Sequence, residues 1–409
     1  MASVRIDRCR SGATVFPPSM HHPKVFVAQL SLAAAITLTA QAERDVLVKH
    51  HSSADLPPAY EETTSKALKP GRVESPAPVA RPKKLPMAPR ETGATIERIA
   101  PEFDKLVAAG AEVEVIAEGL HWSEGPVWIA HGSYLLFSDV PENKIYKWTQ
   151  NAGLSVYLEP SGYTGTGLHF NEPGSNGLTV DRAGHLVFCQ HGNRRIVRQN
   201  AHGEIEPVVE TYQWRKFNSP NDLVFDRRGN LYFTDPPYAH VGLNASPLKE
   251  LSFNGVYLYK SDGKILLLED KLSFPNGIAL SPDEKKLYVG VSDPEKPVIM
   301  VYDVKPDGAV GAGTLFFDAK PLVPGHFGLP DGMKVDVQGN IWSTGPGGVL
   351  VISPSGRLLG TIATGVPTGN CAWGEDGSTL FITANHRVLR LKTLVKGYGP
   401  WNDRLAAQR

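Results

Sequence analysis

The sequence predicts an all-β protein, a six-bladed β-propeller, because one unit recurs six times from Ser123 onward. Each unit consists of a polar residue, a short apolar strand, a turn and a second apolar strand. The units lie about 40–55 residues apart, which is the period of a propeller blade. They begin with the segments SEGPVWI, SNGLTV, PNDLVF, PNGIAL, PDGMKV and GNCAWG. A pair of β-sandwiches is the alternative, but that fold does not require such regular repetition.

Further strand-like segments and turn signals occupy the intervals between these units. KIYKW, GVYLYK, IMVYDV and VLVIS are examples, so each blade has enough strands for a four-stranded sheet. Asp-x-x-Gly sequences at Asp181, Asp226 and Asp336 predict tight hairpin turns. The alternating segment AEVEVIAEG at 111–119 is expected to add one strand to the last blade. Such a strand would close the ring and cover two exposed sheet edges.

Residues 1–42 are predicted to be a signal peptide. Basic residues precede the apolar run VFVAQLSLAAAITLTA, which ends in the cleavage pattern Ala40-Gln41-Ala42. Translation from Met20 instead of Met1 would leave a more compact signal of the same kind. An uncleaved anchor is the alternative, but the run is short for a membrane span. The sequence therefore predicts an exported protein, periplasmic or secreted, with no membrane attachment after cleavage.

Residues 43–95 are predicted to be a disordered linker, because they are rich in proline and charge and poor in large apolar residues. A tether is the simplest role for this segment, and docking to a partner or to the cell wall is the alternative. The propeller domain is expected to span 96–397, with a C-terminal tail at 398–409. A short helix is expected at 100–109, in the segment APEFDKLVAA.

Composition excludes several classes of function. The chain has 42 basic and 42 acidic residues and no basic stripe, so nucleic acid and anionic membranes are not expected partners. Three cysteines in 409 residues do not make a disulfide framework, and Cys189 and Cys371 are expected to be buried thiols. The sequence contains no G-x-S-x-G nucleophile elbow, no P-loop and no G-x-G-x-x-G after a strand. Neither a serine nucleophile nor a nucleotide cofactor is therefore predicted.

The repeated polar residue is the main functional signal. The innermost strand of every blade lines the channel, so equivalent positions converge on the axis. Two carboxylates and several amide oxygens with no cysteine favour a hard cation, and an irregular cage favours Ca²⁺ over Mg²⁺. Polar residues that cap strands or hold channel waters are the alternative interpretation. The six residues are Glu124, Asn176, Asn221, Asn276, Asp331 and Asn370.

The motifs EGPVW, SPND, PNGIALS and PDGMKVD, in this order, resemble the gluconolactonase / regucalcin / luciferin-regenerating-enzyme family. The segments CQHGNRRI and YFTDPPY are most similar to bacterial gluconolactonases. The resemblance covers about residues 112–393, and the first 110 residues have no counterpart in the family core. It implies a divalent ion, usually calcium, bound by Glu124, Asn221, Asn276 and Asp331. It leaves Asn176 facing the substrate or lying behind the ligands.

Further residues are candidates for contact with a small-molecule substrate. His191 and Arg194 follow an inner hairpin and are expected at the channel mouth, although a plain polar turn is an equal alternative. The connection 163–174 is predicted to form a loop over the site, with Tyr163 and His169 available for contact. Asn176, Arg194, Tyr163 and His169 are therefore the predicted substrate-binding residues.

The favoured hypothesis is a Ca²⁺-dependent lactonase that opens sugar-acid lactones of the glucono-1,5-lactone type by attack of water. Asp331 is the predicted general base, and His191 is the alternative. A propeller binding module with a structural calcium is the rival from another class. The same scaffold acting on other lactones or organophosphate esters is a third hypothesis, because loops around the mouth set substrate fit. Another divalent cation in place of calcium, and the oligomeric state, are left open.

Overall fold

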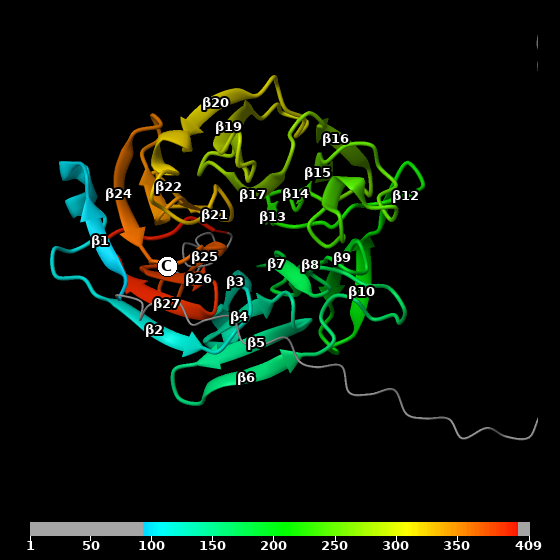
Figure 1. Ribbon diagram of the computed structural model, residues 1–409, viewed down its shortest axis with the longest axis horizontal. Helices are drawn as coiled ribbons and strands as arrows, with labels where there is room; N and C mark the ends of the chain where they lie inside the picture. Colours follow the sequence, from blue (N-terminus) through cyan, green and yellow to red (C-terminus); the bar gives the residue numbers. More distant parts are fainter. Residues whose placement is uncertain (1–92, 400–409) are drawn as a thin grey trace, which may run out of the picture. The chain divides into compact units, whose positions relative to one another are not determined.

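The computed structural model describes residues 93–399 and shows an all-β six-bladed propeller, as the sequence predicts (Figure 1). The predicted signal peptide at 1–42, most of the predicted linker at 43–95 and nearly all of the predicted tail at 398–409 lie outside the described residues. Within 93–399, each of six antiparallel sheets has at least four strands. In the same part of the chain, no helix has the length and apolar character to cross a membrane.

The first three blades follow one another along the chain, and each runs from an innermost to an outermost strand. Blade 1 contains β3 (Ser123–Ile129), β4 (Tyr134–Asp139), β5 (Lys144–Thr149) and β6 (Gly153–Leu158). Blade 2 contains β7 (Ser175–Val180), β8 (Leu186–Gln190), β9 (Arg195–Gln199) and β10 (Ile205–Val209). Blade 3 contains β13 (Leu223–Phe225), β14 (Leu231–Asp235), β15 (Gly255–Tyr259) and β16 (Ile265–Glu269).

The other three blades complete the ring. Blade 4 contains β17 (Pro275–Leu280), β18 (Lys286–Val291), β19 (Val298–Asp303) and β20 (Thr314–Asp318). Blade 5 contains β21 (Met333–Val335), β22 (Ile341–Gly345), β23 (Gly348–Ile352) and β24 (Leu358–Ala363). Blade 6 contains β25 (Asn370–Gly374), β26 (Thr379–Ala384) and β27 (Arg387–Lys392), and its outermost strand is β2 (Val113–Glu118).

A few short elements stand outside this pattern. β1 (Thr95–Arg98) pairs antiparallel with β24 as a fifth strand of blade 5, so the last residue of the predicted linker, Thr95, belongs to a strand. The helix expected at 100–109 is a single 3₁₀ turn, η1 (Pro101–Lys105), whose Phe103 is buried. Short connecting elements are η2 (Ala130–Gly132), η3 (Leu243–Ala245), η4 (Lys320–Leu322) and the hairpin of β11 (Thr211–Tyr212) and β12 (Arg215–Lys216).

The innermost strands form a closed circle around the channel. β3 contacts β7, and contacts continue through β13, β17 and β21 to β25, which in turn contacts β3 (Figure 1). Apolar side chains fill the space between neighbouring blades. Val127 and Leu136 of blade 1, for example, pack with Leu178 and Phe188 of blade 2. Both predicted thiols, Cys189 and Cys371, are free and buried in strands of this core.

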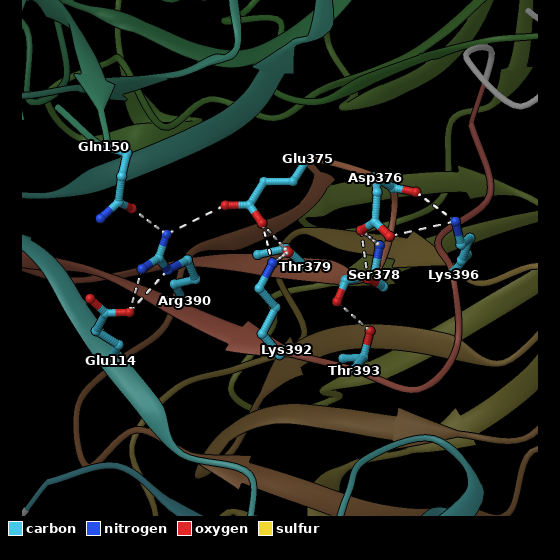
Figure 2. A network of polar contacts seen from close by, with 10 residues as sticks. All are labelled: Glu114, Gln150, Glu375, Asp376, Ser378, Thr379, Arg390, Lys392, Thr393 and Lys396. Carbon is cyan, nitrogen blue, oxygen red and sulfur yellow. Dashed lines mark hydrogen bonds and ion pairs between the residues drawn. The ribbon is translucent and has the colours of Figure 1, made fainter. Parts of the chain in front are cut away.

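A polar network links β2 and β27 of blade 6 to blade 1 (Figure 2). The Arg390 guanidinium on β27 donates from Nε and Nη2 to Glu114 Oε2 of β2, at 3.0 and 2.6 Å. Its Nη1 donates to Gln150 Oε1 in the turn between β5 and β6, at 2.6 Å. The same guanidinium lies 5.5 Å from the centre of the Trp148 ring. Arg390 therefore joins three strands from distant parts of the sequence.

The predicted Asp-x-x-Gly turns are confirmed as hairpin turns. Asp226 Oδ1 accepts hydrogen bonds from the backbone N–H groups of Arg228 and Asn230 at 2.9 and 2.8 Å. Gly229 has φ +84°, a left-handed conformation that favours glycine. Asn230 Nδ2 also donates to Asp226 Oδ2 at 2.7 Å. Turns of this kind at the end of the innermost strands fix the register of β13 on β14 and of its equivalents.

Hydroxyl groups on or just after the second strands tie four of the six blades to the blade that follows. Each donates to a backbone carbonyl near the start of the following innermost strand, and all four donors are well buried or partly buried. The bonds run from Ser138 Oγ to Asn176 O at 2.8 Å, from Thr234 Oγ1 to Asn276 O at 2.6 Å, from Ser292 Oγ to Pro330 O at 2.6 Å and from Thr344 Oγ1 to Gly369 O at 2.9 Å. These bonds set the positions of the polar residues at the channel.

We expect Thr234→Val to lower the free energy of unfolding by about 1–3 kcal/mol, because it removes the donor to a buried carbonyl. The ladder of β17 on β18 is irregular between Pro275 and Ile278, so the Asn276 carbonyl depends on Thr234. Chemical denaturation measures the change. The matched control is Thr314→Val on the exposed outermost strand β20, which should change stability by less than about 0.5 kcal/mol. Equal stability of the Thr234 and Thr314 variants would contradict this assignment.

Candidate metal and active site

The six repeated polar residues lie at or just before the start of the innermost strands, at one end of the channel. Where glycine follows the polar residue, neighbouring strands approach so closely that no side chain fits between them. A Cβ on Gly125 would lie 2.0 Å from the carbonyl oxygen of Asn176, and a Cβ on Gly277 would lie 2.0 Å from that of Asp331. Glycine after the polar residue is therefore a packing requirement, and it draws the polar side chains toward the axis.

Glu124 and Asp331 are two carboxylates that destabilise each other's charge. Burial raises the pKa of Glu124 to about 8, and the charge of Asp222 adds to this effect. A hydrogen bond of 2.7 Å from the Gly125 N–H to Glu124 Oε2 acts in the opposite direction. Burial, followed by the charges of Glu124 and Asp222, raises the pKa of Asp331 well above its usual value. Glu124, Asp222 and Asp331 therefore lie within electrostatic range of one another.

Two asparagines present unpaired oxygens to the same region. Asn276 Nδ2 donates to Ser292 Oγ at 2.9 Å, which turns Oδ1 to the other side, where this buried oxygen has no hydrogen-bond partner among the described residues. Asn176 Oδ1 is likewise buried and without a partner in residues 93–399. Asn221 is held through its backbone, whose N–H donates to Thr234 O and whose carbonyl accepts from the Gly177 N–H, both at 2.8 Å. Unpaired buried oxygens of this kind require an explanation.

This arrangement fits a hard divalent cation. Buried carboxylates with raised pKa values and amide oxygens without donors are both relieved when a cation binds them. Oxygen ligands of this type suit Ca²⁺. No three His, Cys, Asp or Glu side chains in 93–399 are grouped closely enough to form a metal site by themselves. A site here therefore depends on the asparagine oxygens as well as on Glu124 and Asp331.

Several residues near the site were not singled out from the sequence. Asp222 is buried, and its charge acts on both Glu124 and Asp331. The signal for it was present, because Asp222 occupies the place after the polar residue where four of the six units have glycine. Tyr238 is close to Asn276, Ser292 and Asp331, and its pKa is raised by burial.

His191 lies beside Glu172 under the mouth of the channel. The ring is fully buried, and its Nδ1 is 3.1 Å from Glu172 Oε2. The charge of Glu172 in turn raises the pKa of both Glu124 and Asp331. The predicted alternative base therefore lies within electrostatic range of the two carboxylates.

The Arg194 guanidinium already has partners within the protein. Its Nε donates to the Phe217 carbonyl at 2.6 Å, and its Nη1 donates to Glu250 Oε1 at 3.0 Å. A longer bond of 3.3 Å joins Nη2 to the Lys216 carbonyl. The predicted substrate contact of Arg194 stays a prediction that this geometry does not favour, because the guanidinium holds neighbouring backbone instead.

The loop 163–174 is anchored at one end and exposed in its middle. The rings of Tyr163 and Phe170 pack edge to face with 4.9 Å between their centres. Asn171 Nδ2 donates to the His240 carbonyl at 2.8 Å and so ties the loop to the segment after β14. His169 is exposed and Tyr163 is half-buried. Both predicted contact residues thus belong to one loop with a fixed base.

Known proteins are similar to this chain in sequence and in fold. The model of the SMP-30/Gluconolactonase/LRE-like region matches residues 122–386. The chain belongs to this family.

The relatives include named gluconolactonases. A gluconolactonase from Zymomonas mobilis is 44% identical over 315 residues, which are 75% of this chain and 88% of that protein. The solved structure of a gluconolactonase from Xanthomonas campestris has a TM-score of 0.63 and 30% identity, and the match covers 74% of this chain and 98% of that one. A diisopropyl-fluorophosphatase from Loligo vulgaris is 24% identical over 259 residues, which are 59% of this chain and 78% of that protein.

The raised pKa of Glu124 predicts how stability depends on pH when no divalent cation is present. The folded protein then holds a proton that the unfolded chain, with an ordinary pKa near 4.5, releases. Stability should therefore fall as pH rises from about 5 to about 8. Melting temperatures in EDTA measure this slope, and Glu124→Gln should flatten it. The same slope in the variant and in the original protein would assign the effect to another group.

Proposed function

We propose that the protein hydrolyses sugar-acid lactones of the glucono-1,5-lactone type and that it requires a divalent cation, calcium, at the start of the innermost strands. The observation that supports this proposal is the pair of buried carboxyl groups with raised pKa values, Glu124 and Asp331, together with the unpaired Oδ1 of Asn276. Membership of a family that includes named gluconolactonases supports the reaction class.

Glu124, Asn221, Asn276 and Asp331 would hold the cation. Their backbones are fixed by the closely packed strands and by the hydroxyl bonds between blades, so little reorganisation is needed on binding. When bound, a divalent cation supplies Lewis-acid polarisation of a carbonyl group and stabilises negative charge on its oxygen. Proton transfer and substrate orientation are proposed to come from the side chains of the protein itself.

Asp331 is the proposed general base for the attacking water. Burial and the neighbouring carboxylates raise its pKa, whereas a bound cation would lower it, so Asp331 would act as the base through an oxygen that is free of the cation. A hydrogen bond with the Asn276 side chain orients the carboxylate and moderates the rise in its pKa. His191 is the second candidate base, held beside Glu172.

Substrate orientation is proposed to come from Asn176 and from the loop 163–174. The Asn176 oxygen is buried without a partner among the described residues, so it can accept a hydrogen bond from a substrate hydroxyl group. Tyr163 and His169 on the loop are the proposed contacts at the mouth.

Lactone hydrolysis and its cation requirement are tested together in one assay. Glucono-1,5-lactone and a panel of other lactones are offered to the protein as isolated, after EDTA, and after calcium is added back. We expect turnover that EDTA abolishes and calcium restores. Calcium-dependent stabilisation without turnover of any lactone would favour a binding module instead.

The role of Asp331 is tested by Asp331→Asn, which keeps the shape and one oxygen ligand but removes the basic charge. We expect a folded protein that binds calcium and loses at least about 100-fold in kcat. Glu124→Gln is the comparison, and it should mainly weaken calcium binding. Near-normal turnover of Asp331→Asn at saturating calcium would exclude Asp331 as the base and shift the assignment to His191.

A second candidate activity is hydrolysis of organophosphate esters, which the relative named diisopropyl-fluorophosphatase favours. The proposed cation chemistry suits a phosphoryl oxygen as well as a carbonyl oxygen. Adding diisopropyl fluorophosphate to the panel compares the two activities directly.

Export of the protein, based on residues 1–42, is also a proposal, and the mass of the mature chain tests it.

A further inference from the structure

Lys334 is a positively charged residue at the inner end of the proposed cation site. It lies on β21, and its Nζ donates to the Met333 carbonyl at 3.0 Å and to Asn370 Oδ1 at 3.2 Å. Nζ is also 3.9 Å from Asp222 Oδ2, in a pair whose side chains are 25% and 2% exposed. Lys334 contributes as well to the lining of a cavity of about 600 Å³ at the opposite end of the innermost strands.

The contacts of Asn370 fix which way its amide points. Oδ1 accepts from the Cys371 N–H at 2.9 Å and from Lys334, while Nδ2 donates to Asp222 Oδ2 at 3.3 Å. A hydrogen bond from the Asn370 side chain also lowers the pKa of Glu124. Donors thus lie on one side of the amide and carboxylates on the other. The opposite orientation would set NH₂ against an ammonium group and oxygen against two carboxylates.

Asn276 occupies the equivalent place in blade 4, but its amide group is turned the other way. Its Nδ2 donates to Ser292 Oγ, and its Oδ1 is left unpaired. The difference between the two asparagines comes from the group behind each of them, a hydroxyl oxygen behind Asn276 and an ammonium behind Asn370. Equivalent residues of one repeat are therefore given different roles by their neighbours.

Packing leaves Asn370 little freedom to move away. A Cβ on Gly332 would lie 1.9 Å from Asn370 Cγ. The Asn370 amide therefore packs directly against the backbone of Gly332, the residue just before β21. Lys334 is two residues further along the same segment. The backbone that confines the amide thus also carries the charge that orients it.

Lys334 adds a positive charge to a region that is rich in carboxylates. Glu124, Asp222 and Asp331 carry three negative charges when ionised, and of these three Asp222 is the one in ion-pair range of Lys334, while Glu172 lies beside His191. A divalent cation supplies two positive charges, and Lys334 supplies the third. An uncompensated buried carboxylate is strongly destabilising.

We propose that Lys334 is a positioning residue that acts as the resident cation of the channel: it neutralises Asp222 and orients Asn370 as a donor to Glu124 and Asp222. This inference rests on the proposed function for its effect on turnover. Asn370 is consequently excluded from the ligands of the divalent cation. Lys334 itself does not touch the substrate, and it acts through Asp222 and Asn370.

The test compares Lys334→Met, which keeps length and removes charge, with Lys334→Arg, which keeps the charge. Lys264→Met is the matched control, because Lys264 forms an exposed ion pair with Asp262. Three quantities are measured for each variant: the melting temperature in EDTA, the calcium dissociation constant by calorimetry, and kcat and KM for the lactone.

We expect Lys334→Met to melt at least about 5 °C lower in EDTA, because the buried Asp222 carboxylate is left without its counter-charge. Calcium should bind at least about fivefold more tightly, because the repulsive ammonium is gone. In the loaded enzyme kcat should fall about tenfold or more with KM little changed, because the site then carries an excess negative charge that opposes charge on the carbonyl oxygen. Lys334→Arg should stay within about threefold of the original protein in kcat.

A double variant separates charge balance from packing. In an Asp222→Asn background, Lys334→Met should lower the melting temperature in EDTA by less than about 2 °C, because the charge that Lys334 neutralises is already absent. An equal loss in both backgrounds would overturn the proposal, as would calcium binding that weakens in Lys334→Met. If no variant and no original protein hydrolyses a lactone, the proposed function fails, while stability and calcium binding still decide the role of Lys334.

Discussion

The close approach of the six innermost strands is the constraint on which the rest of this structure depends. Where these strands begin, backbone meets backbone without room for a methyl group, as at Gly125 and Gly277. The polar residue before each glycine has no space to turn outward, so its side chain is directed to the axis. Hydroxyl groups such as that of Thr234 then hold the carbonyl of the next blade in place. The strand packing that forms the propeller therefore also positions the polar residues of the site.

This constraint has an electrostatic cost that shapes the chemistry. Burial of Glu124 and Asp331 near each other raises both pKa values, and Asp222 adds a third carboxylate to the same region. A part of this cost is met inside the chain, by Lys334 and by the hydrogen bonds of Asn370. The remainder favours a divalent cation.

The sequence predicts what repeats and misses what depends on contacts between blades. Glu124, Asn276 and their equivalents were found because the same place recurs in every unit, and the propeller itself follows from that period. Asp222 and Lys334 depart from the pattern of their units. Their interaction with each other and with Asn370 depends on the contact between blades 3, 5 and 6, which the sequence does not show. The β1 strand was also missed, since four residues of mixed polarity carry too weak a signal. The amide orientation of Asn370 likewise needs the position of Lys334.

A crystal structure of the calcium-loaded protein is the most direct measurement of the central claim. The account predicts one ion with ligand oxygens of Glu124, Asn221, Asn276 and Asp331 at about 2.3–2.6 Å, and Asn370 Oδ1 turned away toward Lys334. An ion bound instead in the cavity at the opposite end of the innermost strands, or coordinated by Asn370 Oδ1, would contradict it.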